Sequence, residues 1–206
     1  ATAARQGGSQ LSDAALETAV RGHGSARQWA RALELLRDSL QSRAGVTVRC
    51  YAAGIGACGK SQRWQHAMSL LCEMRETELE PNVVSYNCAI SACEKGDQWR
   101  RALLLFDEMR GATLEPTVVS YNLQISACEK SGGWQQALSL FSELREARLE
   151  PSVVSYGAAT SACEKGEQWQ RALLLLAESR AANVETNILC YNAGVSACAK
   201  SGQWRQ

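Results

Sequence analysis

The chain has 206 residues, of which 21% are charged, and a formal net charge of +1. This near-neutral balance excludes a uniformly basic nucleic-acid-binding protein, and no apolar run approaches the roughly 18 residues that cross a membrane. The nine cysteines include no CxxC pair, and the two histidines do not complete a zinc set of the usual spacing, so we expect reduced, metal-free cysteines in a reducing compartment.

The N-terminal segment 1–12 is predicted to be a tail. Its first ten residues, ATAARQGGSQ, contain no apolar stretch and no initiator methionine. We interpret this segment as the start of a fragment or as the remainder of a processed targeting sequence.

A single 35-residue period organises the rest of the chain, and such a period predicts a solenoid of stacked repeats. We number the positions of a repeat as slots, with Val83 at slot 1 and Thr117 at slot 35. The period predicts repeats at 13–47, 48–82, 83–117, 118–152 and 153–187 and a partial repeat at 188–206, so we expect the chain to continue. It is carried by Trp29, Trp64, Trp99, Trp134, Trp169 and Trp204 and by Tyr51, Tyr86, Tyr121, Tyr156 and Tyr191.

The repeat 13–47 is the least regular and is interpreted as a capping or divergent repeat. It has Leu16 at the tyrosine slot and Glu17 where the other repeats have Asn, Ala or Gly. It therefore carries less of the pattern than the repeats that follow.

Each repeat predicts two helices. In the repeat 83–117 they cover about 83–95 and 98–110, with a stop at Gly96 and Asp97 between them. Pro116 cannot continue the second helix, and the polar residue at slot 35 is a good N-cap for the next first helix. The slot 35 residues are Asn82, Thr117, Ser152 and Asn187.

One face of each predicted helix is apolar, because residues at helical spacing share a side. A two-helix hairpin cannot bury two such faces alone, so we expect an all-α solenoid of stacked antiparallel helix pairs. Its packing residues in the repeat 83–117 are Val83, Tyr86, Ile90 and Cys93 on the first helix and Trp99, Ala102, Leu103, Phe106 and Met109 on the second.

The other face of the first helix carries slots 2, 5, 9 and 13. In the repeat 83–117 these are Val84, Asn87, Ser91 and Lys95. Stacked first helices would line one surface with apolar, small polar and cationic rows. An apolar side chain can wedge a base, an amide can read its edge, and an ammonium can hold its phosphate, so this surface has the chemistry for single-stranded RNA.

The pattern V-V-[ST]-Y-N, followed by small residues with Cys, by Lys and by Ala-Leu-x-Leu-Phe-x-Glu-Met, resembles the pentatricopeptide repeat over about residues 13–206. The resemblance implies a right-handed superhelix in which two or three side chains of each repeat read one base. It assigns base reading to Asn87, Thr117, Asn122, Ser152, Gly157, Asn187, Ala52, Asn82 and Asn192, base wedging to Val84, Val119 and Val154, and phosphate contact to Lys60, Lys95, Lys130, Lys165 and Lys200.

Some slots depart from the family pattern. Ala52 and Gly157 carry no side-chain hydrogen-bonding group, so they can admit a base without specifying it. Arg49 replaces the apolar wedge, and Thr117 fits no strong base preference. Asn122 with Ser152 resembles a pyrimidine-reading pair that leans to cytosine.

Two functions are consistent with these features. The first is sequence-selective binding of single-stranded RNA for processing, stability or translation, in a soluble protein of a plastid or mitochondrion, as the resemblance implies. The second is a scaffold that binds protein subunits of a larger organellar complex. It is favoured by the truncated ends, the weak specificity slots and the near-neutral charge. Individual slots also have a structural interpretation, since slot 35 residues are helix caps and three lysines directly follow Glu94, Glu129 and Glu164.

An enzyme is not expected in this segment. It has neither the H-x-E with C-x-x-C of a zinc deaminase nor a glycine-rich phosphate loop, and two histidines imply no Ser/His/Asp arrangement. We expect no cofactor, no small-molecule substrate and no membrane insertion.

Overall fold

The computed structural model describes residues 13–25, 28–41, 46–77, 79–184 and 187–202, and these residues form eleven α-helices and no strand. The prediction of an all-helical repeat fold is confirmed. The predicted tail 1–12 and Trp204 lie outside the described residues. The helices are α1 (Asp13–Ser25), α2 (Trp29–Gln41), α3 (Val48–Lys60), α4 (Trp64–Glu76), α5 (Val83–Lys95), α6 (Trp99–Gly111), α7 (Val118–Ser131), α8 (Trp134–Glu146), α9 (Val153–Lys165), α10 (Trp169–Ala181) and α11 (Ile188–Lys200).

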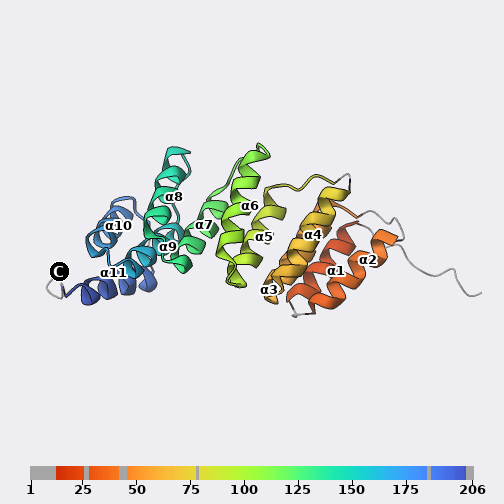
Figure 1. Cartoon of the computed structure of the whole chain (residues 1–206), viewed down its shortest axis with the longest axis horizontal. Helices are drawn as coiled ribbons and strands as arrows, with labels where there is room; N and C mark the ends of the chain where they lie inside the picture. Colours follow the sequence, from red (N-terminus) through yellow and green to blue (C-terminus); the bar gives the residue numbers. More distant parts are fainter. Residues whose placement is uncertain (1–12, 26–27, 42–45, 78, 185–186, 203–206) are drawn as a thin grey trace, which may run out of the picture. The chain divides into compact units, whose positions relative to one another are not determined.

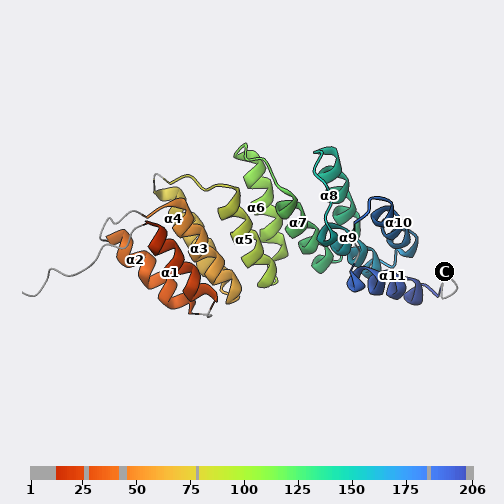
Figure 2. The same ribbon diagram turned by 180° about the vertical axis from the view of Figure 1, so that it is seen from behind.

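The chain divides into two compact units, Ala1–Gly96 and Asp97–Gln206, here called unit 1 and unit 2. In unit 1 the first helices stack on one another, with α3 between α1 and α5 (Figures 1 and 2). The second helices α2 and α4 each pack against their own first helix and against the first helix of the following repeat.

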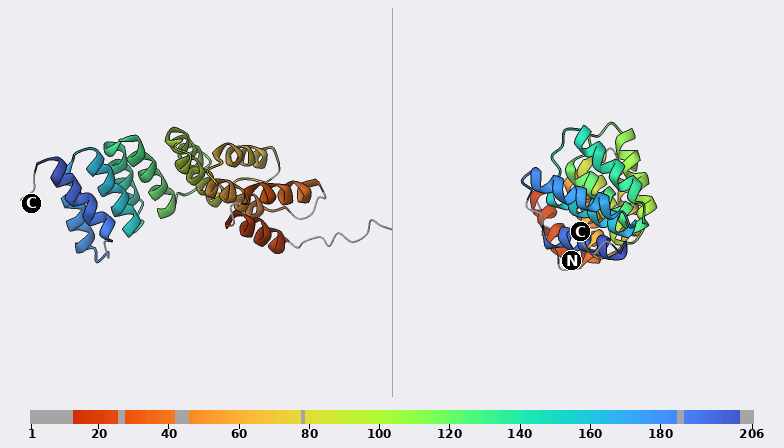
Figure 3. Two further views of the ribbon diagram at one scale, coloured as in Figure 1. Left: turned by 90° about the horizontal axis from the view of Figure 1, so that it is seen from below. Right: turned by 90° about the vertical axis from the view of Figure 1, so that its left-hand side faces the viewer.

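Unit 2 repeats this arrangement with α9 between α7 and α11, as its green-to-blue helices show in Figure 3. Helix α8 contacts α7 and α9, helix α10 contacts α9 and α11, and α6 contacts α7. Each first helix thus packs against second helices on one side and against neighbouring first helices on another. No helix among the described residues has the length and apolar character needed to cross a membrane.

The predicted N-caps are confirmed at four first helices, where the slot 35 side chain accepts a hydrogen bond from the backbone N–H three residues later. At Thr117 and Ser152 the contact is reciprocal, because the hydroxyl groups of Ser120 and Ser155 accept hydrogen bonds from the cap N–H at 3.1 and 2.9 Å. These capping boxes satisfy backbone donors that the helix itself leaves unpaired. The four caps are Asn82, Thr117, Ser152 and Asn187.

The predicted stop after α5 is present, but its glycine acts by size rather than by conformation. Gly96 has a φ of −91°, and the left-handed residue is Asp97 with a φ of 55°. A Cβ atom on Gly96 would lie 2.4 Å from Cδ1 of Trp64, and one on Gly166 would lie 2.2 Å from Cδ1 of Trp134. A glycine here therefore lets the tryptophan of the preceding repeat pack against the backbone.

The core follows the predicted faces. Tyr86 is 4% exposed and Ile90 and Cys93 are fully buried, as are Ala102 and Met109 on α6. Val83, Trp99 and Leu103, which were predicted for the same faces, are half-buried. Leu105, which the prediction did not include, is 3% exposed.

The recurring cysteines are buried packing residues with free thiols, as predicted for Cys93, Cys128 and Cys163. Burial raises the pKa of Cys58, Cys128 and Cys163 to about 11, so these thiols are protonated at neutral pH.

Candidate nucleic-acid interface

The slot 2 side chains of α5, α7 and α9 are exposed apolar residues. Val84, Val119 and Val154 are 57%, 58% and 62% exposed, although they begin helices whose opposite sides are buried. A single exposed valine has no special meaning, but the same position is exposed on α5, α7 and α9. These are the residues to which the resemblance assigns base wedging, and that role stays a prediction.

A cleft of about 620 Å³ lies between the first helices of unit 2. It brings together residues that the resemblance assigns to base recognition, although they come from different helices. Val154 and Gly157 come from α9, Asn187 caps α11, and Asn192 comes from α11 itself. Leu189 occupies slot 2 of the last repeat, is 68% exposed and also lines the cleft.

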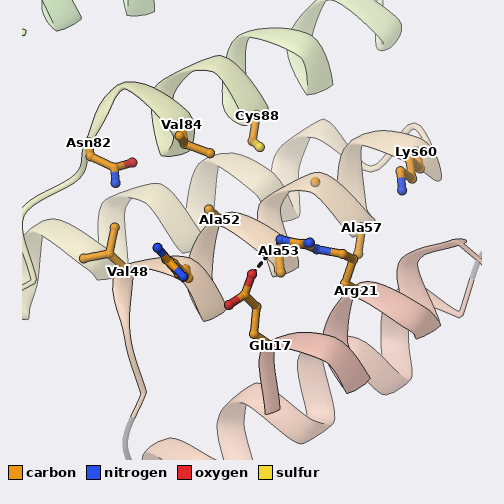
Figure 4. A pocket seen from close by; sticks show the side chains of 12 residues that line it. Glu17, Arg21, Val48, Ala52, Ala53, Ala57, Lys60, Asn82, Val84 and Cys88 are labelled. Carbon is orange, nitrogen blue, oxygen red and sulfur yellow. Dashed lines mark hydrogen bonds and ion pairs between the residues drawn. The ribbon is translucent and has the colours of Figure 1, made fainter. Parts of the chain in front are cut away.

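A second cleft, of about 660 Å³, lies at the corresponding slots of unit 1. In Figure 4, Glu17 and Arg21 of α1 lie across the cleft from Val84 and Cys88 of α5. Its lining includes the predicted residues Ala52, Asn82, Val84 and Lys60, together with Arg49 at slot 2 of α3. Both clefts therefore combine slots 2, 5 and 35, and their volumes are typical of small-molecule pockets.

The predicted pair Asn122 and Ser152 is in contact. Asn122 Nδ2 donates a hydrogen bond to Ser152 Oγ at 3.2 Å, and the same hydroxyl oxygen accepts from Ser155 N at 3.4 Å. Asn122 Oδ1 is buried without a partner among the described residues. An amide can rotate to exchange its nitrogen and oxygen, so Asn122 can turn either a donor or an acceptor toward a ligand.

The asparagine caps, Asn82 and Asn187, differ from the serine cap Ser152 because an amide carries both an acceptor oxygen and a donor nitrogen. Oδ1 of Asn82 accepts from Ser85 N at 3.0 Å, and Oδ1 of Asn187 accepts from Cys190 N at 3.1 Å. Since capping uses the oxygen, each amide nitrogen remains a donor at the edge of its cleft. Gly157, the slot 5 residue of the repeat that ends at Asn187, has Cys190 Sγ 3.3 Å from the position of a Cβ atom, so this site has little room for a larger residue.

Asn87 and Thr117 belong to different units. Asn87 is half-buried on α5, and its Oδ1 has no partner among the described residues. Thr117 is exposed and caps α7 through its capping box. Thr117 thus has the capping role that was predicted for slot 35.

The five slot 13 lysines are all exposed, but they differ in their partners. Lys165 Nζ lies 3.1 Å from Glu129 Oε1, and Lys200 Nζ lies 3.0 Å from Glu164 Oε1, so each pairs with slot 12 of the preceding repeat. In contrast, Lys60 and Lys95 form no ion pair with a described residue. Lys130 is the remaining member of the row.

Sequence reasoning did not identify these inter-repeat ion pairs. The glutamates also accept hydrogen bonds from slot 9 serines, at 2.8 Å from Ser161 to Glu129 and at 2.6 Å from Ser196 to Glu164. The hydrogen bond from Ser196 and the charge of Lys200 lower the pKa of Glu164. The available signal was the 35-residue recurrence of glutamate directly before lysine.

No three His, Cys, Asp or Glu side chains in the described part of the chain are arranged to hold a metal ion. The two clefts are lined by apolar side chains, amide groups and carboxylates, with hydroxyl groups in the cleft of unit 2 and cations in the cleft of unit 1. Such groups can stack on, hydrogen-bond to and neutralise a ligand.

Comparison with solved structures gives the same fold. The pentatricopeptide repeat protein PPR10 in complex with an 18-nt psaJ RNA element is 26% identical, with a TM-score of 0.71 over 94% of this chain and 29% of that chain. PPR10 from maize is 23% identical, with a TM-score of 0.70 over 92% and 27% of the two chains. This chain thus spans less than a third of PPR10.

The PPR domain of Arabidopsis thaliana protein-only RNase P 1, in complex with tRNA, is 13% identical, with a TM-score of 0.73 over 94% of this chain and 98% of that chain. A search of curated proteins found no match. The model of the PPR repeat family matches residues 46–95, 81–128 and 116–165, which together cover more than half of the sequence. The chain therefore belongs to the pentatricopeptide repeat family.

Proposed function

We propose that the chain binds single-stranded RNA along its first helices, with one nucleotide recognised by each repeat. The observation that carries the proposal is the recurrence of a cleft at slots 2, 5 and 35 in both units. The similarity to PPR10, whose structure contains an RNA element, supports the class of ligand. From the family resemblance we also propose an organellar role in RNA processing, stability or translation, and we assign no catalytic step to this segment.

The clefts suggest how a base is held. In unit 2 a base enters between the exposed side chains of Val154 and Leu189, where its faces are removed from water. Gly157 offers no polar group to its edge, whereas the amide nitrogen of Asn187 can donate a hydrogen bond. The repeat 153–187 therefore favours a base that presents an acceptor, and its specificity rests on one contact.

The repeat 118–152 has two polar groups at the same slots. Ser152 is engaged with Ser155 and Asn122, so Asn122 is the group that turns toward the base. The family resemblance assigns a pyrimidine to this pair, with a preference for cytosine. This repeat should therefore discriminate bases more strongly than the repeat 153–187.

The test is a pair of substitutions in one repeat, measured by fluorescence anisotropy with RNAs that differ only at the base opposite it. Asn122→Ala should weaken binding of the preferred pyrimidine by less than the ~1–3 kcal/mol of a stacked base, because only the edge contact is lost. Val119→Ala is the matched control and should weaken all four RNAs equally. Equal affinities for the four bases before and after Asn122→Ala contradict base reading at this slot.

A protein scaffold is the second candidate. It is favoured by the ion pairs of Lys165 and Lys200, which leave these lysines less able to bind phosphate, and by the net charge of +1. The two functions differ in a single measurement. If the chain binds no single-stranded RNA at low salt, the surface of first helices is a protein-binding surface.

A further inference from the structure

We propose that the cleft of unit 1 is a phosphate-binding site, formed mainly by Arg49 and Lys60, and that phosphate binding is concentrated in unit 1. This inference rests on the proposed RNA-binding function. It adds that unit 1 contributes more of the phosphate contacts than unit 2. The ligand is a phosphate group of the RNA, either a terminal monophosphate or an internal phosphodiester.

The lining of this cleft has more positive than negative charge. Arg21 comes from α1, and Arg49 and Lys60 come from α3, whereas the only carboxylate in the lining is that of Glu17. Glu17 Oε1 lies 2.6 Å from Arg21 Nη2, so its charge is already compensated. Arg49 and Lys60 are exposed and form no ion pair with a described residue.

The cations also converge in space. Cys88 of α5 lines the cleft, and its burial raises the pKa of its thiol, while the charges of Lys60, Lys95 and Arg21 act in the opposite direction. These three groups belong to three stacked helices, so their fields overlap at one side chain. Figure 4 shows Lys60 and Arg21 on the same side of the cleft as Ala57. An anion placed there would lie beside Lys60 and Arg21, which line the cleft, and would be attracted by the nearby charge of Lys95.

The cleft of unit 2 lacks this excess of positive charge. Its lining includes Glu129 and Glu164, which hold Lys165 and Lys200 in ion pairs. An RNA phosphate can contact either lysine only after its glutamate has been displaced. Hydrogen bonds from Ser161 and Ser196 keep those glutamates in place and oppose the exchange.

Slot 12 distinguishes α3 from the next three first helices. It is Glu94 in α5, Glu129 in α7 and Glu164 in α9, but Gly59 in α3. A Cβ atom on Gly59 would lie 3.1 Å from Cβ of Ala92, so the tight packing of α3 on α5 favours glycine. Without a carboxylate at this slot, Lys95 has no partner of the kind that neutralises Lys165 and Lys200.

Arg49 favours phosphate over a base at this cleft. It stands at slot 2, where three later repeats have the exposed valines Val84, Val119 and Val154. A guanidinium group binds phosphate through two parallel hydrogen bonds, which a valine cannot make. Ala52 lines the same cleft and has no polar group for a base edge. The site is therefore better suited to binding a charged phosphate than to recognising a particular base.

The test measures how RNA affinity depends on salt. Each lost phosphate contact should reduce the slope of log affinity on log salt by about 0.7 for a single strand. Arg49→Val with Lys60→Ala should therefore flatten the slope by about 1.4. Arg49→Val introduces the residue that three other repeats carry at this slot, and an unchanged melting temperature of the variant would show that it folds.

Two control variants separate this site from general charge. Arg31→Gln with Arg37→Gln removes the same net charge from the exposed side of α2 and should leave the slope unchanged. Arg110→Gln with Glu143→Gln removes an ion pair between second helices of unit 2 without changing the net charge, and it should also leave the slope unchanged. A slope that falls equally in the cleft variant and in either control overturns the inference.

RNAs with a 5′-hydroxyl, a 5′-phosphate or a 3′-phosphate distinguish the two sources of the phosphate. A terminal site gives tighter binding of one phosphorylated RNA, and the cleft variant loses that preference. An internal site gives equal binding of all three RNAs, with the same loss of slope.

The unaltered chain provides an independent readout through its thiols. A phosphate in the cleft covers Cys88 and cancels nearby positive charge, so RNA should slow alkylation of Cys88 by iodoacetamide. Cys72 is exposed on α4 and outside the cleft, and its rate of alkylation should not change.

The failure of this inference can be told apart from the failure of the proposed function. If base discrimination at Asn122 persists while the cleft variant keeps the wild-type slope, only this inference fails. If the unaltered chain binds no RNA, the proposed function fails as well.

Discussion

Left-handed backbone conformations recur at two slots among the described residues. Gln62, Asp97, Gly132, Glu167 and Gly202 have φ between 55° and 75° at slot 15, just after each first helix. Thr113, Arg148 and Asn183 have φ between 52° and 57° at slot 31, after the second helix. The fold requires this conformation at these slots, although most of the residues there are not glycine. Non-glycine residues at these slots are therefore strained relative to glycine.

Two glycine substitutions should have different effects on stability. Gly132 has a φ of 75°, whereas Gly111 ends α6 without a positive φ, and at both positions an added Cβ atom would have open space around it. Gly132→Ala should lower the free energy of unfolding by about 1–2 kcal/mol, because alanine is strained at positive φ. Gly111→Ala should leave it unchanged or raise it by up to about 1 kcal/mol. Urea unfolding of both variants checks this, and equal effects would exclude backbone strain as the cause.

The Glu164 carboxylate should contribute stability that depends on pH. Because the hydrogen bond from Ser196 and the nearby Lys200 lower its pKa below 4.5, its contribution is present at neutral pH and is lost as pH falls through the folded-state pKa. Lys200 is half-exposed, so screening limits the effect to about 1 kcal/mol or less. Glu164→Gln should lower the free energy of unfolding near about pH 7 and have little effect near about pH 3. A destabilisation of the same size at both pH values would contradict the ion pair.

At the scale of elements, two pairs of adjacent repeats are joined by a tryptophan that packs on a glycine. Trp64 begins α4 and lies against Gly96 after α5, and Trp134 begins α8 and lies against Gly166 after α9. The Arg171 guanidinium group lies 4.6 Å from the ring centroid of Trp134 and covers it. The contact links adjacent repeats, so it should contribute to their stacking.

A double-mutant cycle tests this contact. Gly166→Ala should lower the free energy of unfolding by about 1–3 kcal/mol, because its methyl group overlaps the Trp134 ring. In the Trp134→Leu background the same change should cost less, since a smaller side chain relieves the overlap. The coupling energy between the two substitutions should therefore be about 0.5–3 kcal/mol in magnitude. Additive effects would mean that Gly166 is required for another reason.

At the scale of the whole molecule, the described repeats share one packing scheme, in which small residues are buried between the first helices. All nine cysteines have free thiols, and those at the recurring slot 11 of α3, α5, α7 and α9 are fully buried. Their size, together with that of the neighbouring alanines, allows the first helices to approach closely. The stability of the array therefore comes from helix packing, which is short-range and repeated.

Thiol reactivity and metal removal check this prediction together. In the native chain Ellman's reagent should react rapidly with the exposed Cys72, while the thiols of Cys58, Cys128 and Cys163, with a pKa of about 11, react only after unfolding. EDTA and reductant should leave the melting temperature unchanged. A stoichiometric zinc content, or a melting temperature that falls with EDTA, would assign the cysteines a ligand role.

The sequence by itself determined the local structure of this protein. The helix bounds of α5, the caps at Thr117 and Ser152, and the buried face with Tyr86 all follow from helical spacing and capping within a few residues. Recurrence strengthened each of these signals, because an identical residue every 35 positions has the same environment in every repeat. The slots of the candidate site could be named for the same reason.

Only the tertiary structure decided which groups meet across repeats. Lys165 pairs with Glu129, 36 residues earlier, and Asn122 donates to Ser152, 30 residues later, because stacking places one helix terminus beside the next. The cluster around Cys88 likewise depends on three helices lying side by side. Helical periodicity specifies the direction of a side chain on its own helix but not the spacing and register between helices. Whether a lysine meets a carboxylate depends on that spacing and register. In the sequence the slot 13 lysines are therefore equivalent, whereas in the structure Lys165 and Lys200 form ion pairs with described residues and Lys60 and Lys95 do not.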